Sequence, residues 1–106
     1  MKPLKFVGSA LDELCRFPID ARRSVGHELW QVQMGLLPTD FRPMPSVGGG
    51  CYEIRVHTGE EWRVITLRSL QAPSMCCTHF KKKSRATARH DLEIARKRFD
   101  PIRTKL

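Results

Sequence analysis

The amino-acid sequence predicts an α+β fold with two N-terminal helices, a small antiparallel sheet of three or four strands and a C-terminal helix. Three observations predict this fold. Apolar residues recur at helical spacing near both ends of the chain, polar and apolar residues alternate strictly over residues 52–57, and a segment rich in proline and glycine separates the two patterns. We expect the helices to cover one face of the sheet and to leave at least part of the other face open to a partner.

The first two helices are predicted between residues 9 and 36. Ser9, followed three residues later by Asp12, resembles a capping box and predicts a short helix that ends at Phe17-Pro18. Pro18 can then occupy the first position of a second helix, because that position needs no backbone N–H donor. The apolar residues of this second helix lie at steps of four, three and four, at Val25, Leu29, Val32 and Leu36.

The middle of the chain is predicted to form the sheet. Residues 38–50 contain three prolines and three consecutive glycines, which favours an irregular connection. Residues 52–57 alternate in the pattern of a strand with one wet face, and residues 62–67 return as a more apolar, central strand after a turn at 58–60. Residues 74–80 supply a third strand.

The end of the chain is predicted to form the last helix. Thr87 can cap it, and Pro101 lies just beyond its end. Its apolar side is again spaced by four, three and four residues, at Ala88, Leu92, Ala95 and Phe99.

Length and composition predict one domain over residues 1–106. No run approaches the roughly 20 apolar residues that span a bilayer, and the start of the chain does not resemble a signal peptide, so we expect a cytoplasmic protein without a membrane partner. No pair of cysteines has the Cys-x-x-Cys spacing of zinc and redox sites, so we expect reduced thiols and no bound metal. The four cysteines are Cys15, Cys51, Cys76 and Cys77.

Positive charge is concentrated at the end of the chain. Residues 79–106 contain ten Lys/Arg and three Asp/Glu, a net charge of +7, whereas residues 1–78 contain nine and eight, a net charge of +1. This asymmetry favours a polyanionic partner, and the alternative is a solvated, charged surface helix.

Two arginines and a basic run are the candidate functional residues. If the hairpin turns around Gly59, Arg55 lies opposite Arg63 on one face of the sheet. Two like charges at facing positions cost stability, which favours an anion bound over them, although surface charges that avoid each other would explain the pattern as well. The basic run 79–87 precedes a helix start, where lysines and backbone amides can bind phosphate.

This basic run carries a resemblance to a known family. The segment 78–87 resembles the stretch His-Ala-Phe-Gln-Lys-Lys-Thr-Gln-Lys-Thr that marks phage-derived RelE/HigB-like toxins of bacterial type II toxin–antitoxin systems. The similarity covers residues 2–99, with Thr78 in the place of the family histidine and Ala86 in the place of the family's second lysine of the Lys-Thr pair. Further matching segments lie at 2–8, 17–23, 41–45, 53–56, 62–65 and 91–96.

The resemblance implies a RelE/ParE-like fold, a helix-turn-helix antitoxin as partner and cleavage of mRNA in the ribosomal A site. Such an endoribonuclease, or mRNA interferase, lets the ribose 2′-hydroxyl attack the neighbouring phosphate, which needs cations and a proton carrier but no metal or small-molecule cofactor. By this resemblance, the cations that bind phosphate and offset transition-state charge are Arg55, Arg63, Lys82 and Lys83. The candidate proton carrier is His79, which neighbours the position of the family histidine. Other RNA contacts are assigned to Lys81, Ser84, Arg85, Thr87 and Arg89.

Two other functions remain open at this point. A ParE-like toxin that binds gyrase needs a protein-binding surface and no proton carrier, and a degenerate family member that only binds nucleic acid fits the charge equally well. The remaining histidines are expected to be structural, namely His27, His57 and His90.

Overall fold

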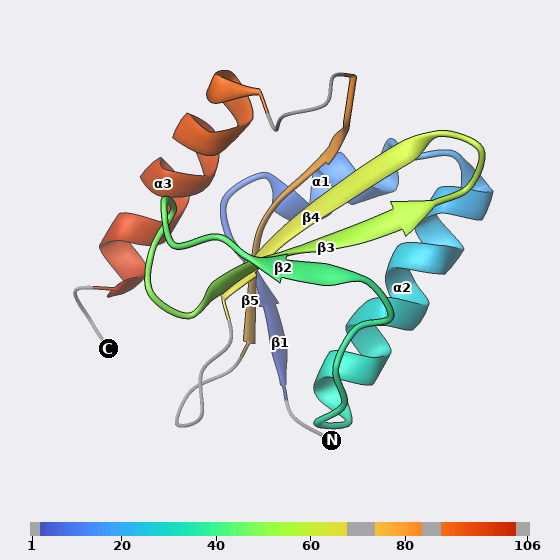
Figure 1. The fold of residues 1–106 in the computed structure, drawn as a ribbon, viewed down its shortest axis with the longest axis horizontal. Coiled ribbons are helices and arrows are strands. Elements are labelled where there is room, and N and C mark those ends of the chain that lie inside the picture. The colour runs from blue at the N-terminus through green and yellow to red at the C-terminus, as the bar shows by residue number, and fades with distance from the viewer. Residues whose placement is uncertain (1–2, 68–73, 84–87, 104–106) are drawn as a thin grey trace.

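The computed structural model describes residues 3–67, 74–83 and 88–103, and within them three helices flank a five-stranded sheet (Figure 1). The strands lie in the order β1-β5-β4-β3-β2. The elements are β1 (Leu4–Phe6), α1 (Ala10–Cys15), α2 (Ile19–Gln33), β2 (Phe41–Pro43), β3 (Cys51–His57), β4 (Glu61–Leu67), β5 (Ser74–Lys81) and α3 (Arg89–Arg103). The predicted α+β fold, with two N-terminal helices, antiparallel strands and a C-terminal helix, is confirmed.

Strands β2 to β5 form an antiparallel sheet, and β1 adds a fifth strand that the sequence did not reveal. This edge strand pairs in parallel with β5, with Leu4 opposite Ser74. Its three residues are too few to show an alternating pattern, and parallel pairing with a strand 70 positions away leaves no local signal.

The structure corrects the prediction that residues 38–50 are wholly irregular. Phe41–Pro43 forms β2, which pairs with β3 so that Phe41 faces Ile54 and Pro43 faces Tyr52. Because β2 lies at the edge of the sheet, the missing N–H of Pro43 need not break a ladder between two other strands.

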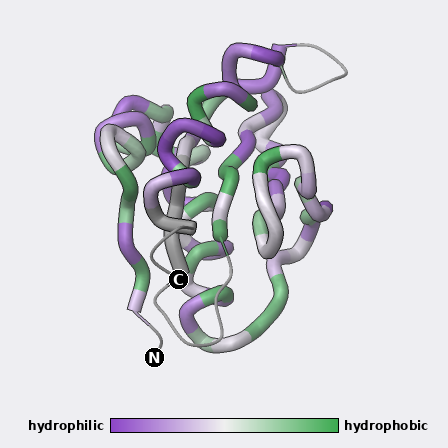
Figure 2. The backbone as a smooth tube through the Cα atoms, turned by 90° about the vertical axis from the view of Figure 1, so that its left-hand side faces the viewer, coloured by the Kyte–Doolittle hydropathy of each residue, from purple (hydrophilic) through white to green (hydrophobic). Residues whose placement is uncertain are grey.

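The helices cover both faces of the sheet, and the prediction that they share one face is wrong. α2 packs its apolar side against β3 and β4 residues such as Ile54 and Val64. α3 packs Ala95 and Phe99 against the other face, which carries Ile65. The two helices accordingly lie on either side of the sheet in Figure 1, and much of the rest of α3 is hydrophilic (Figure 2). This arrangement is possible because β4 is apolar on both faces near its end.

One predicted cap and two predicted helix ends need correction. α1 begins at Ala10 as expected, but Ser9 makes no side-chain capping hydrogen bond. α2 ends at Gln33, so Leu36 lies outside the helix and is exposed. α3 continues through Pro101, whose missing N–H costs one hydrogen bond close to the end of the helix. The predicted cap Thr87 lies outside the described residues.

The two cysteines whose burial is described differ in exposure. Cys51 is buried, whereas Cys15 is exposed. Within the described ranges, no three His, Cys, Asp or Glu side chains are grouped as potential metal ligands. Helices long and apolar enough to cross a bilayer are also missing from the part of the chain that the structure describes.

Candidate functional site

Three arginines gather on the face of the sheet that also carries α3. Arg55 and Arg63 lie directly opposite each other across β3 and β4, so the predicted register of the hairpin is confirmed. Arg42 on β2 lies opposite Glu53 on β3, and Glu53 and Arg55 share a face because they are two residues apart in one strand. We call Arg42, Glu53, Arg55 and Arg63 the arginine cluster.

Glu53 lies at the centre of this cluster. Its side chain is 0% exposed, and its Oε1 lies 3.4 Å from Nε of Arg42, 3.5 Å from Nε of Arg63 and 3.8 Å from Nε of Arg55. A carboxylate buried to this extent is tolerated only when cations or hydrogen-bond donors compensate it. The three arginines supply that compensation from three different strands.

The three arginines differ in how much of their hydrogen-bonding capacity the fold uses. The side chain of Arg63 is only 5% exposed, and it donates from NH1 to the carbonyl of Trp62 (2.9 Å) and from NH2 to Oε1 of Glu61 (3.2 Å). Arg42 and Arg55 are 44% and 30% exposed. In the described residues their one acidic partner is Glu53, so both can also contact a ligand from solvent.

Lys82 extends the cluster along the end of β5. Its backbone N–H donates to the carbonyl of Glu61 (2.7 Å), and Phe80, two residues earlier, lies opposite Arg63. Lys82 therefore projects to the same face as the arginines. Partial burial and the positive charge of Arg63 lower the pKa of the Lys82 amine.

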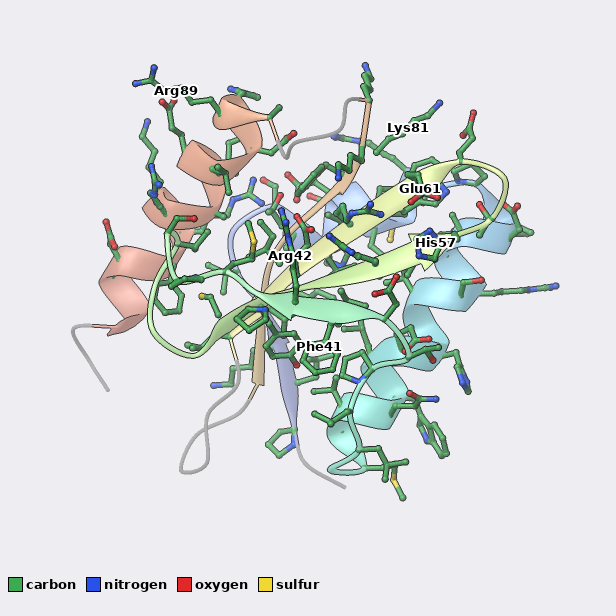
Figure 3. The ribbon with its side chains drawn as sticks, in the orientation of Figure 1. Phe41, Arg42, His57, Glu61, Lys81 and Arg89 are labelled. Carbon is green, nitrogen blue, oxygen red and sulfur yellow. The ribbon has the colours of Figure 1, made fainter. Side chains whose placement is uncertain are left out.

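The cluster carries an excess of positive charge. With Lys82 and Glu61 included, it holds four cations and two carboxylates, which gives a net charge of +2. Among the described residues, none forms an ion pair with the Lys82 ammonium. Such an arrangement can bind a phosphate group and offset the charge that develops on it during reaction. Figure 3 shows Arg42 and Glu61 close to the strands that carry the cluster.

Comparison with protein-family models gives a match over residues 12–100, described as "Phage derived protein Gp49-like (DUF891)". The chain belongs to this Gp49-like family. The family is associated with RelE-like toxins of toxin–antitoxin systems. No curated protein matches the chain significantly.

In this Gp49-like chain a further group of polar residues adjoins the arginine cluster. His57 lies between two carboxylates, with Nε2 2.7 Å from Oδ2 of Asp40 and Nδ1 2.7 Å from Oε1 of Glu61. The hydrogen bonds to Asp40 and Glu61 raise the pKa of His57. Because Glu61 also accepts from Arg63, His57 is linked to the cluster through one shared carboxylate (Figure 3).

His79, the predicted proton carrier, does not lie at the arginine cluster. It faces Val64 across β4 and β5, on the side of the sheet opposite Arg63, and only 3% of it is exposed. Its ring lies 5.9 Å from that of Phe6 and 6.1 Å from that of Phe17. Burial lowers the pKa of His79 to about 4, so the imidazole is neutral near pH 7.

The other predicted RNA contacts are dispersed around the end of β5 and the start of α3. Lys81 pairs with Glu60 (2.8 Å), and Arg89 pairs with Glu93 (3.1 Å) and projects outward from the first turn of α3 (Figure 3). Lys83 is exposed and, with Lys81 and Lys82, borders a cleft of about 390 Å³. The predicted positions Ser84, Arg85 and Thr87 lie outside the described residues.

Sequence reasoning did not identify Arg42, Glu53 or Glu61 as site residues. Glu53 resembled any polar residue on the wet side of an alternating strand, and nothing local marks it as buried. Arg42 belongs to a segment that was expected to be irregular, so its pairing with β3 was not foreseen. The available signal was the pattern Glu53, Arg55, His57, in which charged or ionisable side chains occupy alternate positions of one strand.

Proposed function

We propose that this Gp49-like chain is the toxin of a type II toxin–antitoxin pair, and that it is a RelE/HigB-like endoribonuclease that cuts mRNA on the ribosome without a metal. One observation carries the proposal: Arg42, Arg55 and Lys82 gather on one accessible part of the sheet. The nearly buried Arg63 lies beside them. These cations come from β2, β3, β4 and the residue that follows β5, so the fold as a whole holds them together.

The proposed reaction is attack of a ribose 2′-hydroxyl on the adjacent phosphorus, which forms a 2′,3′-cyclic phosphate and breaks the bond to the 5′-oxygen. The proton of the 2′-hydroxyl passes to solvent water, and the departing 5′-oxygen gains one. The negative charge that grows on the phosphate oxygens is offset by Arg55 and Arg42. Lys82 is suited to protonate the departing oxygen, because the lowered pKa of its amine makes proton release easier than from an ordinary lysine.

The proposed partners follow from the charge distribution and the family. The net charge of +7 over residues 79–106 suits a polyanionic surface such as ribosome-bound mRNA. The toxin–antitoxin association of the Gp49-like family supports an antitoxin protein as partner, and we propose one of the helix-turn-helix class.

A second candidate is a toxin that acts by binding a protein target such as gyrase, without nuclease activity. One observation favours it: His79 is enclosed between Phe6 and Phe17 on the opposite face from the arginines, so it cannot transfer protons there without a rearrangement of the core.

The two candidates differ in what fails when the protein is expressed. We expect induction to arrest growth and to produce new mRNA 5′ ends within codons, both in cells and in a purified translation system, but not on the same RNA without ribosomes. Arrest with altered DNA supercoiling and no new 5′ ends would support the gyrase-binding candidate instead.

The site assignment is tested by the double variant Arg55→Ala with Lys82→Ala. Removing two phosphate-binding cations should lower the rate of mRNA cleavage about 100-fold or more. The matched control is Arg22→Ala with Arg23→Ala, which removes the same charge from exposed positions on α2. Arg63 is left unchanged, because its side chain is only 5% exposed and also donates to Trp62 and Glu61, so its truncation would disturb the fold as well as the charge. Cleavage by the double variant at the parent rate would refute the assignment.

A further inference from the structure

Three arginines converge on the buried carboxylate of Glu53. We propose that Glu53 is a positioning residue: its buried carboxylate holds the guanidinium groups of Arg42 and Arg55 so that, with Lys82, they bind one phosphate group. The proposal rests on the proposed function, because the phosphate it names is that of an RNA backbone.

The contacts of Glu53 restrict the arginine side chains. One oxygen of Glu53 lies within 4 Å of the Nε of Arg42, Arg55 and Arg63, and its side chain is fully buried. Arginine side chains have many rotamers, and an isolated exposed arginine samples most of them. The shared negative charge of Glu53 below the sheet surface favours rotamers of Arg42 and Arg55 that keep Nε inward. Their terminal nitrogens remain available to a ligand.

The strand that carries Glu53 is held on both sides. Glu53 belongs to β3, which is hydrogen-bonded to β2 on one side and β4 on the other. Glu53 faces Arg42 across one ladder and Ile65 across the other. A central strand paired on both edges moves less than a loop, so groups anchored to it keep their geometry before a ligand arrives. Preorganised groups bind more tightly because less conformational entropy is lost on binding.

The arginines differ in how accessible they are to a ligand. Arg63 donates to the carbonyl of Trp62 and to Glu61, and its side chain is nearly inaccessible. Arg63 therefore helps to balance the charge of Glu53 and is not placed to contact a ligand. Arg42 and Arg55 have no acidic partner other than Glu53 among the described residues, and the ammonium of Lys82 has none there. These three cations are the ones placed to contact a phosphate.

Positioning and simple charge balance predict opposite effects of neutralising Glu53. If Glu53 only offsets positive charge, Glu53→Gln makes the site more positive and should strengthen the binding of an anion. If Glu53 positions the arginines, the amide holds them less well, and anion binding should weaken although the site has become more positive.

The test uses inorganic phosphate and an RNA oligonucleotide made uncleavable by 2′-deoxy substitution, titrated into the full chain at constant ionic strength and followed by calorimetry. We expect Glu53→Gln to weaken the binding of both probes about tenfold. Glu53→Asp keeps the charge but withdraws the carboxylate by one methylene, and we expect a loss of similar size. The controls are Glu93→Gln and Glu93→Asp, at an exposed position whose partner is Arg89.

The outcomes separate the possibilities. Phosphate binding by Glu53→Asp that equals the parent's, or tighter binding by Glu53→Gln, overturns the positioning role. If Glu53→Gln fails to fold, Glu53→Asp decides the question by itself. If both Glu53 variants bind the probes more weakly than the parent but the parent never cleaves RNA, the proposed function is refuted and the positioning role stands.

Discussion

At the scale of single residues, two buried ionisable side chains show how surroundings determine a role. Glu53 is enclosed by the guanidinium groups of Arg42, Arg55 and Arg63, which supply the polar contacts that burial requires. His79 is enclosed by the rings of Phe6 and Phe17, which favour its neutral form. The first arrangement suits a site that binds anions, and the second suits a hydrophobic core.

The burial of His79 predicts a pH-dependent stability. Its pKa is about 4 in the folded protein and near 6.5 in an unfolded chain, so below pH 6.5 the unfolded state takes up a proton that the folded state does not. The stabilising contribution is complete above pH 6.5 and is lost as the pH falls toward 4, by up to about 3 kcal/mol. Urea unfolding of the parent and of His79→Phe at pH 7.5 and pH 4.5 measures it.

Replacing His79 by phenylalanine removes the titrating group while keeping an aromatic ring. The free energy of unfolding of this variant should therefore fall less with pH than that of the parent. His27→Gln, at an exposed position on α2, should retain the parent's dependence. Equal pH dependence in the parent and in His79→Phe would contradict the assigned pKa.

At the scale of elements, the fold is held together by contacts of α3 with distant segments. Oε1 of Glu13 on α1 accepts hydrogen bonds from Arg98 on α3 (2.9 Å), from Oγ1 of Thr78 (3.0 Å) and from the N–H of His79 on β5 (3.1 Å). Burial by itself would raise the pKa of Glu13, but these hydrogen bonds hold it below its ordinary value. One carboxylate thus joins three elements.

Phe99, which follows Arg98 on α3, packs against the connection between β2 and β3, and this contact predicts a sensitive glycine. A Cβ built on Gly48 would clash with Cε1 of Phe99, so Gly48→Ala must displace the ring. We expect this variant to lose about 1–3 kcal/mol of unfolding free energy, as is typical of overpacked cores. Gly49→Ala is the matched control, because its Cβ would meet nothing within 4 Å, and it should stay within about 0.5 kcal/mol of the parent. Equal denaturant midpoints for the two variants would show that α3 is not seated on Gly48.

At the scale of the whole molecule, the two faces of the sheet serve different purposes. The face under α2 is an apolar core, whereas the other face is shared between α3 and the arginine cluster. The covered part of that second face supplies stability, and the part beyond α3 leaves Arg42 and Arg55 accessible.

This separation predicts how salt affects RNA binding. The affinity for an uncleavable single-stranded RNA should fall as KCl rises from 50 to 200 mM, because binding releases cations from the phosphates. Lys82→Ala should reduce the slope of log affinity against log salt by about 0.7, the value for one phosphate contact on a single strand. Arg23→Ala on α2 should leave the slope unchanged, and fluorescence anisotropy would reveal both. If the slope for Lys82→Ala equals that of the parent, Lys82 does not contact an RNA phosphate.

The amino-acid sequence alone determined those features that depend on neighbours along the chain. The helical spacing around Val25 and Ala95 and the alternation over residues 52–57 predicted two helices and a hairpin in their correct places. The turn at Gly59 was enough to predict that Arg55 faces Arg63. Each of these follows from a local period or from a turn that fixes register, so no distant contact was needed.

Only the tertiary structure decided which residues meet. The same period in α2 and α3 does not reveal that the helices pack on opposite faces, and a three-residue strand such as β2 has too short a pattern to be predicted. The burial of Glu53 beneath Arg42 and the enclosure of His79 in the core both depend on strands brought together from distant parts of the chain. Burial and charge pairing are properties of the assembled packing, and a side chain's own neighbours in sequence do not determine them.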